Sequence, residues 1–209
     1  MDAREFSREL GVILIATLVL AFSVSYGNNK LLLAALISFF VILAVNILAK
    51  KLAGYFFEID VESRFWTWRQ FGFRTDMHFK KAIPMVWLPL LLSLFSRGAF
   101  WWLAIVDFDF KARPERVSKR HGLYRFTQVT EWHVAWIALW GIIANVFFAF
   151  AAYFAGFEFF SKLSIYFALW SVVPLSSLDG SKILFSSRAL WAVVASILVA
   201  LFFWVQIVI

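Results

Sequence analysis

Two polar sites stand out because each lies within or beside a long apolar stretch. Residues 141–145 read Gly-Ile-Ile-Ala-Asn, and residues 174–182 read Pro-Leu-Ser-Ser-Leu-Asp-Gly-Ser-Lys. An asparagine in lipid seeks a hydrogen-bond partner on a neighbouring helix, and a small residue such as Gly141 lets that helix approach. An ionised carboxylate such as Asp179 is costly beside hydrocarbon. Asn145 therefore marks either a packing face or a binding site, and Asp179 marks either a capping turn or a carboxylate aimed into a helix bundle.

The sequence has few residues that could support metal binding or nucleophilic catalysis. The chain has no cysteine, which excludes disulfides, thiolate metal ligands and a cysteine nucleophile. Its three histidines are His78, His121 and His133. None has helical metal-ligand spacing to another, and single histidines in solvated loops rarely ligate, so no surrogate zinc site is expected.

The composition indicates that lipid solvates much of the chain. Of 209 residues, 63% are hydrophobic and only 16% are charged, whereas a soluble domain carries about 25% charged residues. We therefore expect an α-helical polytopic membrane protein with a single transmembrane domain over 1–209. Uncharged apolar runs predict spans at about 10–29, 31–53, 134–157, 161–178 and 189–209.

The apolar segment 82–106 is ambiguous because two prolines and Arg97 interrupt it. It is either a re-entrant segment or a sixth span. If it does not cross, all of the 20 Lys and Arg residues except Lys30 and Lys162 share one side of the membrane. Such a bias is the norm for cytoplasmic faces. We therefore expect a re-entrant segment and a cytosolic N-terminus, in the plasma membrane of a prokaryote. The net charge of +7 fits this rule, and no nucleic-acid partner is expected.

The polar region between the second and third predicted spans alternates polar and apolar residues, which is typical of strands. It predicts a β-rich cytosolic insert over 55–81 and 107–130. The alternating stretches are 58–62, 107–111 and 124–129, with turns at Gly72, Pro114 and Gly122. We expect one small sheet against the membrane, anchored at the interface by Trp66, Trp68, Trp101 and Trp102.

The order of the motifs resembles the site-2 protease family of intramembrane zinc metalloproteases. In that family a helix with His-Glu-x-x-His is followed by a Gly-Pro-x-x-Asn helix and then by a Leu-Asp-Gly turn. Here Gly141 and Asn145 match the second motif, and Leu178-Asp179-Gly180 matches the third. The resemblance covers about 31–188, and the surroundings of Pro114 and Glu131 resemble small archaeal members. It implies a site-2-protease-like bundle of five to six transmembrane helices with a small membrane-surface β-sheet.

The first motif departs from the family. Val45, Asn46 and Ala49 stand where the family has His, Glu and His. Valine and alanine cannot bind zinc, and an amide cannot act as a general base near neutral pH. A catalytic zinc needs three protein ligands and an open water position. Asp179 is the only ligand-type residue retained, so the resemblance implies a pseudoprotease without zinc.

The expected function is to bind or escort transmembrane client proteins within the lipid bilayer. The family's fold receives an extended client segment, and a sheet edge can pair with such a segment. We expect that edge to face a groove between the second and fourth spans. The expected client-binding residues are Asn145, Asp179, Gly141, Ile59, Val61 and Trp66. Two alternatives stay open: an active intramembrane metalloprotease that uses a non-standard site, and a structural subunit of a membrane complex.

Overall fold

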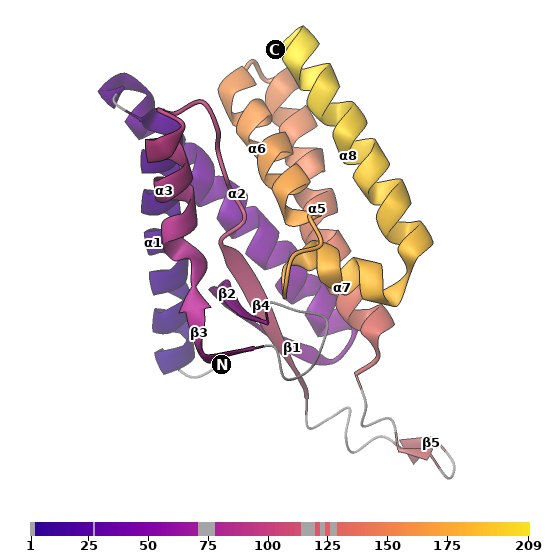
Figure 1. Ribbon diagram of the computed structural model, residues 1–209. Helices are drawn as coiled ribbons and strands as arrows, with labels where there is room; N and C mark the ends of the chain where they lie inside the picture. The colour runs from indigo at the N-terminus through magenta and orange to yellow at the C-terminus, as the bar shows by residue number, and fades with distance from the viewer. Residues whose placement is uncertain (1–2, 27, 71–77, 114–119, 122–123, 126–128) are drawn as a thin grey trace.

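The computed structural model describes residues 3–26, 28–70, 78–113, 120–121, 124–125 and 129–209. Four helices in these residues are long and apolar enough to cross a bilayer, and they run along the bundle in Figure 1. They are α1 (Ala3–Ser25), α2 (Asn29–Phe56), α5 (Glu131–Phe154) and α8 (Arg188–Val208). The expected turns at Gly72, Pro114 and Gly122, and residues 126–128 of the third alternating stretch, lie outside the described residues.

The predicted span 161–178 is not a full membrane-crossing helix. Its helix, α6 (Glu158–Ser171), has 14 residues, or about 21 Å of rise, which is shorter than a hydrocarbon core of about 30 Å. Pro174 cannot continue a helix because it lacks an N–H, and regular helix resumes only at α7 (Asp179–Ser186). The expected count of five to six spanning helices is therefore too high for the described chain. Instead of facing lipid, α6 is buried inside the bundle over residues 163–168.

The segment between β1 (Ile59–Phe65) and β4 (Val106–Ala112) begins and ends at the same end of the bundle, because these two strands pair in antiparallel register. Between them, α3 (Leu88–Phe95) follows the short helix η1 (Met85–Trp87) and lies beside α1 (Figure 1). Two buried hydrogen bonds fix this packing. The Ser93 hydroxyl donates to the Ser23 carbonyl at 2.6 Å, and the Ser23 hydroxyl donates to the Pro89 carbonyl at 3.0 Å. The segment is therefore a hairpin that leaves and rejoins the bundle at the end that carries β1 and β4.

The hairpin reaches the far end of α1. This position changes the predicted side of one basic residue, Arg97. Gly98 lies against the side chain of Tyr26, just beyond the end of α1. Arg97 therefore lies with Lys30 at the end of the bundle away from β1 and β4, whereas the count placed it with the other basic residues.

The return limb of the hairpin, residues 99–105, is not helical, although Leu103 and Ile105 are fully buried. Its polar groups find partners in the protein. The Trp66 N–H donates to the Ile105 carbonyl at 2.8 Å, and the Trp102 indole N–H donates to the Ala104 carbonyl at 2.8 Å. Non-helical backbone at membrane depth is tolerated where protein surrounds it in this way.

Among the described residues the strands form three separate two-stranded ladders, where the sequence indicated one small sheet. Besides β1–β4, these are β2 (Thr67–Gln70) with β3 (His78–Pro84), and β5 (Arg120–His121) with β6 (Tyr124–Arg125). The free edge of β1 does not gain a third strand because α1 lies there, and the carboxylate of Glu9 accepts the Ser63 N–H at 3.1 Å.

Two of the four expected interfacial tryptophans are core residues. Trp66 is 0% exposed and Trp102 is 9% exposed. Their rings stack with centroids 5.9 Å apart. The expectation that they anchor the membrane interface is wrong, because the return limb folds inward and carries Trp102 against Trp66.

Gly54 allows α2 to pass close to β1, and this contact should be sensitive to one methyl group. A Cβ at Gly54 would lie 2.7 Å from the Ile59 carbonyl oxygen and 2.6 Å from Val61 Cγ2. Gly54→Ala should therefore lower stability by about 1–3 kcal/mol, as overpacking does. The matched control is Gly11→Ala in α1, where nothing lies within 4 Å of the new methyl. Thermal unfolding in detergent should show a lower midpoint for the first variant only, and equal midpoints would contradict the close approach.

Candidate functional site

A buried ion pair joins α2 to α7. The Lys50 Nζ donates to Asp179 Oδ2 at 2.6 Å, and the two side chains are 3% and 4% exposed. Charges in a medium of low dielectric attract strongly, but each also loses its hydration. Asp179 thus points into the bundle, as the sharper sequence interpretation required.

Two glycines make room for this pair. A Cβ at Gly141 on α5 would lie 2.7 Å from Lys50 Cε and 2.9 Å from Asn46 Nδ2. A Cβ at Gly180 would lie 2.0 Å from the Val172 carbonyl oxygen, just past the end of α6. Neither position has space for a side chain. Gly141 therefore brings α5 onto Lys50, and Gly180 brings the start of α7 onto the end of α6.

Several polar atoms beside the pair have no hydrogen-bond partner among the described residues. They are Asn46 Nδ2, both side-chain polar atoms of Asn145, and Asp179 Oδ1. All three residues are buried. An unsatisfied buried polar group costs about 1–3 kcal/mol, so these atoms lower the stability of this part of the core. Asn145 lies one helical turn after Gly141, on the same face of α5.

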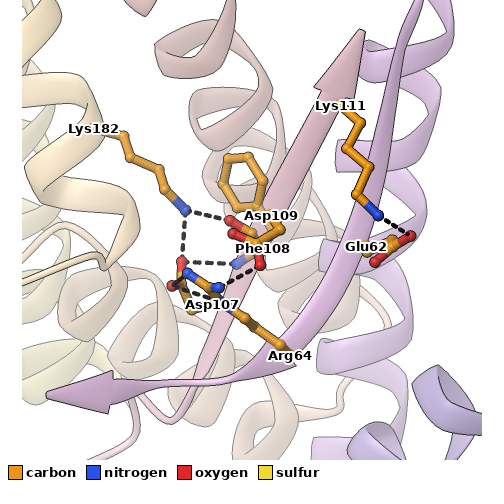
Figure 2. A network of polar contacts seen from close by, with 7 residues as sticks. All are labelled: Glu62, Arg64, Asp107, Phe108, Asp109, Lys111 and Lys182. Atoms are coloured by element: carbon orange, nitrogen blue, oxygen red, sulfur yellow. Dashed lines mark hydrogen bonds and ion pairs between the residues drawn. The ribbon is translucent and has the colours of Figure 1, made fainter. Parts of the chain in front are cut away.

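A second ion pair ties α7 to β4, as Figure 2 shows. The Lys182 Nζ contacts Asp107 Oδ1 at 2.5 Å and donates to the Phe108 carbonyl at 2.8 Å. Arg64 from β1 contacts Asp107 at 3.2 Å and also pairs with Asp109. Lys182 lies 3.5 Å from the centre of the Phe108 ring, and Lys50 lies 5.0 Å from it. One aromatic ring therefore contacts the cations of both buried pairs.

Burial and neighbouring charges shift the pKa of both members of this second pair. Burial alone would raise the pKa of Asp107, but the Lys182 ammonium, a hydroxyl of Ser177 and the Arg64 guanidinium together hold that pKa below its ordinary value. Burial lowers the pKa of Lys182 although Asp107 and Asp179 favour its charged form. Asp107 is thus held as an anion, as a partner for Lys182 requires.

The structure separates the residues that the resemblance grouped on α2. Asn46 faces the interior, as expected, but its partner one turn further on is Lys50. Val45 and Ala49 do share one wall, and this wall lines an apolar groove of about 730 Å³ between α2 and α5. Val45 and Ala49 therefore do not lie on the face of α2 that carries Lys50 and contacts Asp179. Lys50 was missed, although a lysine one turn after an asparagine in an apolar helix was a usable signal.

The expected client contacts on the sheet do not offer their side chains. Ile59, Val61 and Trp66 are all buried in the core. The sequence predicted that a free sheet edge would face a groove between the second and fourth spans, which correspond to α2 and α6. The free edge of β1 instead lies beside α1. A cavity of about 280 Å³ lies along that edge, lined by Glu9, Lys51 and residues from both strands.

The donors around Asp179 do not fit zinc. Tetrahedral zinc sites use thiolate, imidazole and carboxylate ligands. Here an ammonium, which has no lone pair, and the amide of Asn46 stand with a single carboxylate. His133, at the start of α5, instead contacts Thr130 and the ring of Phe57. Across the described residues, no three His, Cys, Asp or Glu side chains are grouped as metal ligands.

The Lys50–Asp179 pair gives a thermodynamic prediction. Lys50→Met or Asp179→Leu alone should lower the free energy of unfolding by about 3–5 kcal/mol, because each leaves an unpaired buried charge. The double variant should be close to the wild type, because both charges are gone. As a control, Lys111→Met removes an exposed pair with Glu62 and should change stability by less than about 1 kcal/mol. Thermal unfolding measures this cycle, and additive losses in the double variant would contradict direct pairing.

Comparison with known proteins found no relatives of this chain. No family model, no curated protein and no solved structure matches it. The case for a function therefore rests on the residues and contacts of the site itself, above all on Asn46, Lys50 and Asp179.

Proposed function

We propose that this protein is a non-catalytic, site-2-protease-like membrane protein that binds a transmembrane segment of a client protein. The observation that carries the proposal is the buried Lys50–Asp179 pair. It stands at the position where the resemblance implies a metal. The positive charge there belongs to the chain itself, and an ammonium can neither polarise a peptide carbonyl as a Lewis acid nor bind an attacking water as a zinc ion does.

The geometry favours a different register for the degenerate motif. Residues i and i+4 share one helix face, and the pair on the Asp179 side of α2 is Asn46 with Lys50. The resemblance placed the two ligand positions at Val45 and Ala49. A shift of one residue moves both positions by about 100° around α2. In this register the two ligand positions hold an amide and an ammonium, so the proposal of a pseudoprotease is unchanged.

The groove on the other face of α2 supports client binding. It is lined almost wholly by apolar side chains of α2 and α5, among them Leu48, Ala49, Ala144 and Phe147. Transmembrane helices associate through close van der Waals packing, and alanines allow that approach. We propose that the end of the bundle carrying β1 and β4 is cytosolic.

A grafted metal site tests the register. Asn46→His/Lys50→His should bind about one zinc per chain with Asp179, because two imidazoles and a carboxylate form a usable ligand set. The matched control, Val45→His/Ala49→His, places the same residues on the groove and should bind none. Elemental analysis of purified protein gives the stoichiometry, and a zinc-dependent rise in the unfolding midpoint gives a second readout.

Each result of the graft has a clear meaning. If the control binds zinc and the first variant does not, Val45 and Ala49 stand at the two ligand positions of the motif, as the resemblance implied. One tightly held zinc per chain in the wild type would overturn the pseudoprotease proposal and favour the metalloprotease alternative.

Crosslinking tests the groove. A photocrosslinking residue at Leu48 or Phe147, which are 60% and 67% exposed, should give adducts with membrane proteins in cells. The control is Phe203 on α8, which is 59% exposed and equally lipid-facing. Mass spectrometry identifies the adducts. Equal labelling at Phe203 would refute the groove as the binding site and would favour a structural subunit with broad contacts.

A further inference from the structure

A further cavity lies at the end of the bundle away from β1 and β4. It has a volume of about 340 Å³ and is formed by three elements: the start of the return limb, α6 and α8. The side chains at its wall are mainly aromatic. They are Phe100, Trp101, Tyr166, Trp170 and Phe202. This cavity is distinct from the buried pair and from the groove between α2 and α5.

The aromatic wall is held together by ring contacts. Trp101 and Tyr166 have centroids 5.9 Å apart, and Tyr166 and Phe202 have centroids 5.2 Å apart. Phe100 meets Trp170 edge-on at 5.5 Å. The Trp101 indole N–H already donates to the Gly98 carbonyl. The rings thus offer faces and edges to an occupant.

The polar side of the cavity is formed by Lys162, Tyr166 and Gln206. The Tyr166 hydroxyl and the Gln206 amide both lie on this side, close enough to interact. Lys162 lines the cavity one turn before Tyr166, and no described residue forms an ion pair or hydrogen bond with it. The cavity therefore combines one unneutralised cation with a hydroxyl and an amide.

We propose that this cavity binds the phosphate group of an anionic phospholipid. Lys162 supplies the positive charge, and Tyr166 with Gln206 supplies hydrogen bonds to the headgroup. Aromatic rings at a membrane interface suit the glycerol region, where one end is apolar and the other is wet. The neighbouring surface of α8 is open to lipid, with Ile197 and Phe203 more than half exposed. A lipid fits this wall better than a free, fully hydrated phosphate.

Lipid retention tests the proposal on the full chain. The protein is reconstituted in nanodiscs of equal phosphatidylglycerol and phosphatidylcholine, extracted in mild detergent and weighed by native mass spectrometry. The wild type should retain phosphatidylglycerol in preference to phosphatidylcholine. Lys162→Gln should weaken that retention about fivefold, which is the effect of one lysine near an anionic headgroup. Lys162→Arg should keep it.

The matched control is Lys30→Gln, which removes the same charge at the same end of the bundle but does not line the cavity. It should retain phosphatidylglycerol as the wild type does. Equal loss in both variants, or equal retention of the two lipids by the wild type, would overturn the proposal. Displacement of the lipid by millimolar inorganic phosphate would also overturn it, and would identify a soluble phosphate as the ligand.

Discussion

Taking an ammonium and a carboxylate out of water costs several kcal/mol per ion, and inside this bundle the direct contact between Lys50 and Asp179 offsets much of that cost. This requirement fixes the start of α7 beneath α2, because the carboxylate is the first residue of that helix. It also explains two positions where no side chain fits. Gly141 leaves space for the lysine stem, and Gly180 lets α7 turn in against the end of α6.

The second pair extends the same constraint to the strands. Lys182 is one turn beyond Asp179 on α7, and its partner Asp107 is the second residue of β4, opposite Arg64 of β1. Because the Phe108 ring contacts both ammonium groups, displacement of β4 would disturb two ion pairs together. The polar face of α2 thus joins the strands and α7 into one unit. Its apolar face, with Val45 and Ala49, takes no part in that network, so a binding groove there can differ in shape without loss of the polar core.

The expected spans overlap the four long helices, because twenty or so apolar residues in a row leave little choice. The bounds of three helices differ by at most three residues, whereas α1 begins at Ala3 rather than at residue 10. The sequence predicted a membrane-crossing length for α6, which has only 14 residues. An apolar run has the same pattern whether it crosses lipid or ends inside protein. The sequence singled out Asn46 and Asp179, which are buried, but Val45 and Ala49 were expected to face Asp179, whereas these two residues line the apolar groove. Val45 and Ala49 have the same spacing as Asn46 and Lys50, so spacing alone does not distinguish the two faces. Charge complementarity would have favoured Lys50.

The pairing of β1 with β4 joins residues more than forty positions apart, and local patterns carry no information on such contacts. For the same reason Trp66 and Trp102 were assigned to the interface.

The buried return limb of the hairpin constrains the order in which the chain can assemble in a membrane. An extended segment whose N–H and C=O groups face hydrocarbon is strongly disfavoured, so residues 99–105 cannot enter the bilayer as a helix does, one span at a time. Their neighbours in the core come from α1, α2 and α6, and α6 follows them in the sequence. The protein environment that buries the limb is therefore complete only when α6, a later part of the chain, is in place. The burial of this earlier segment thus depends on packing against a helix that follows it in the sequence.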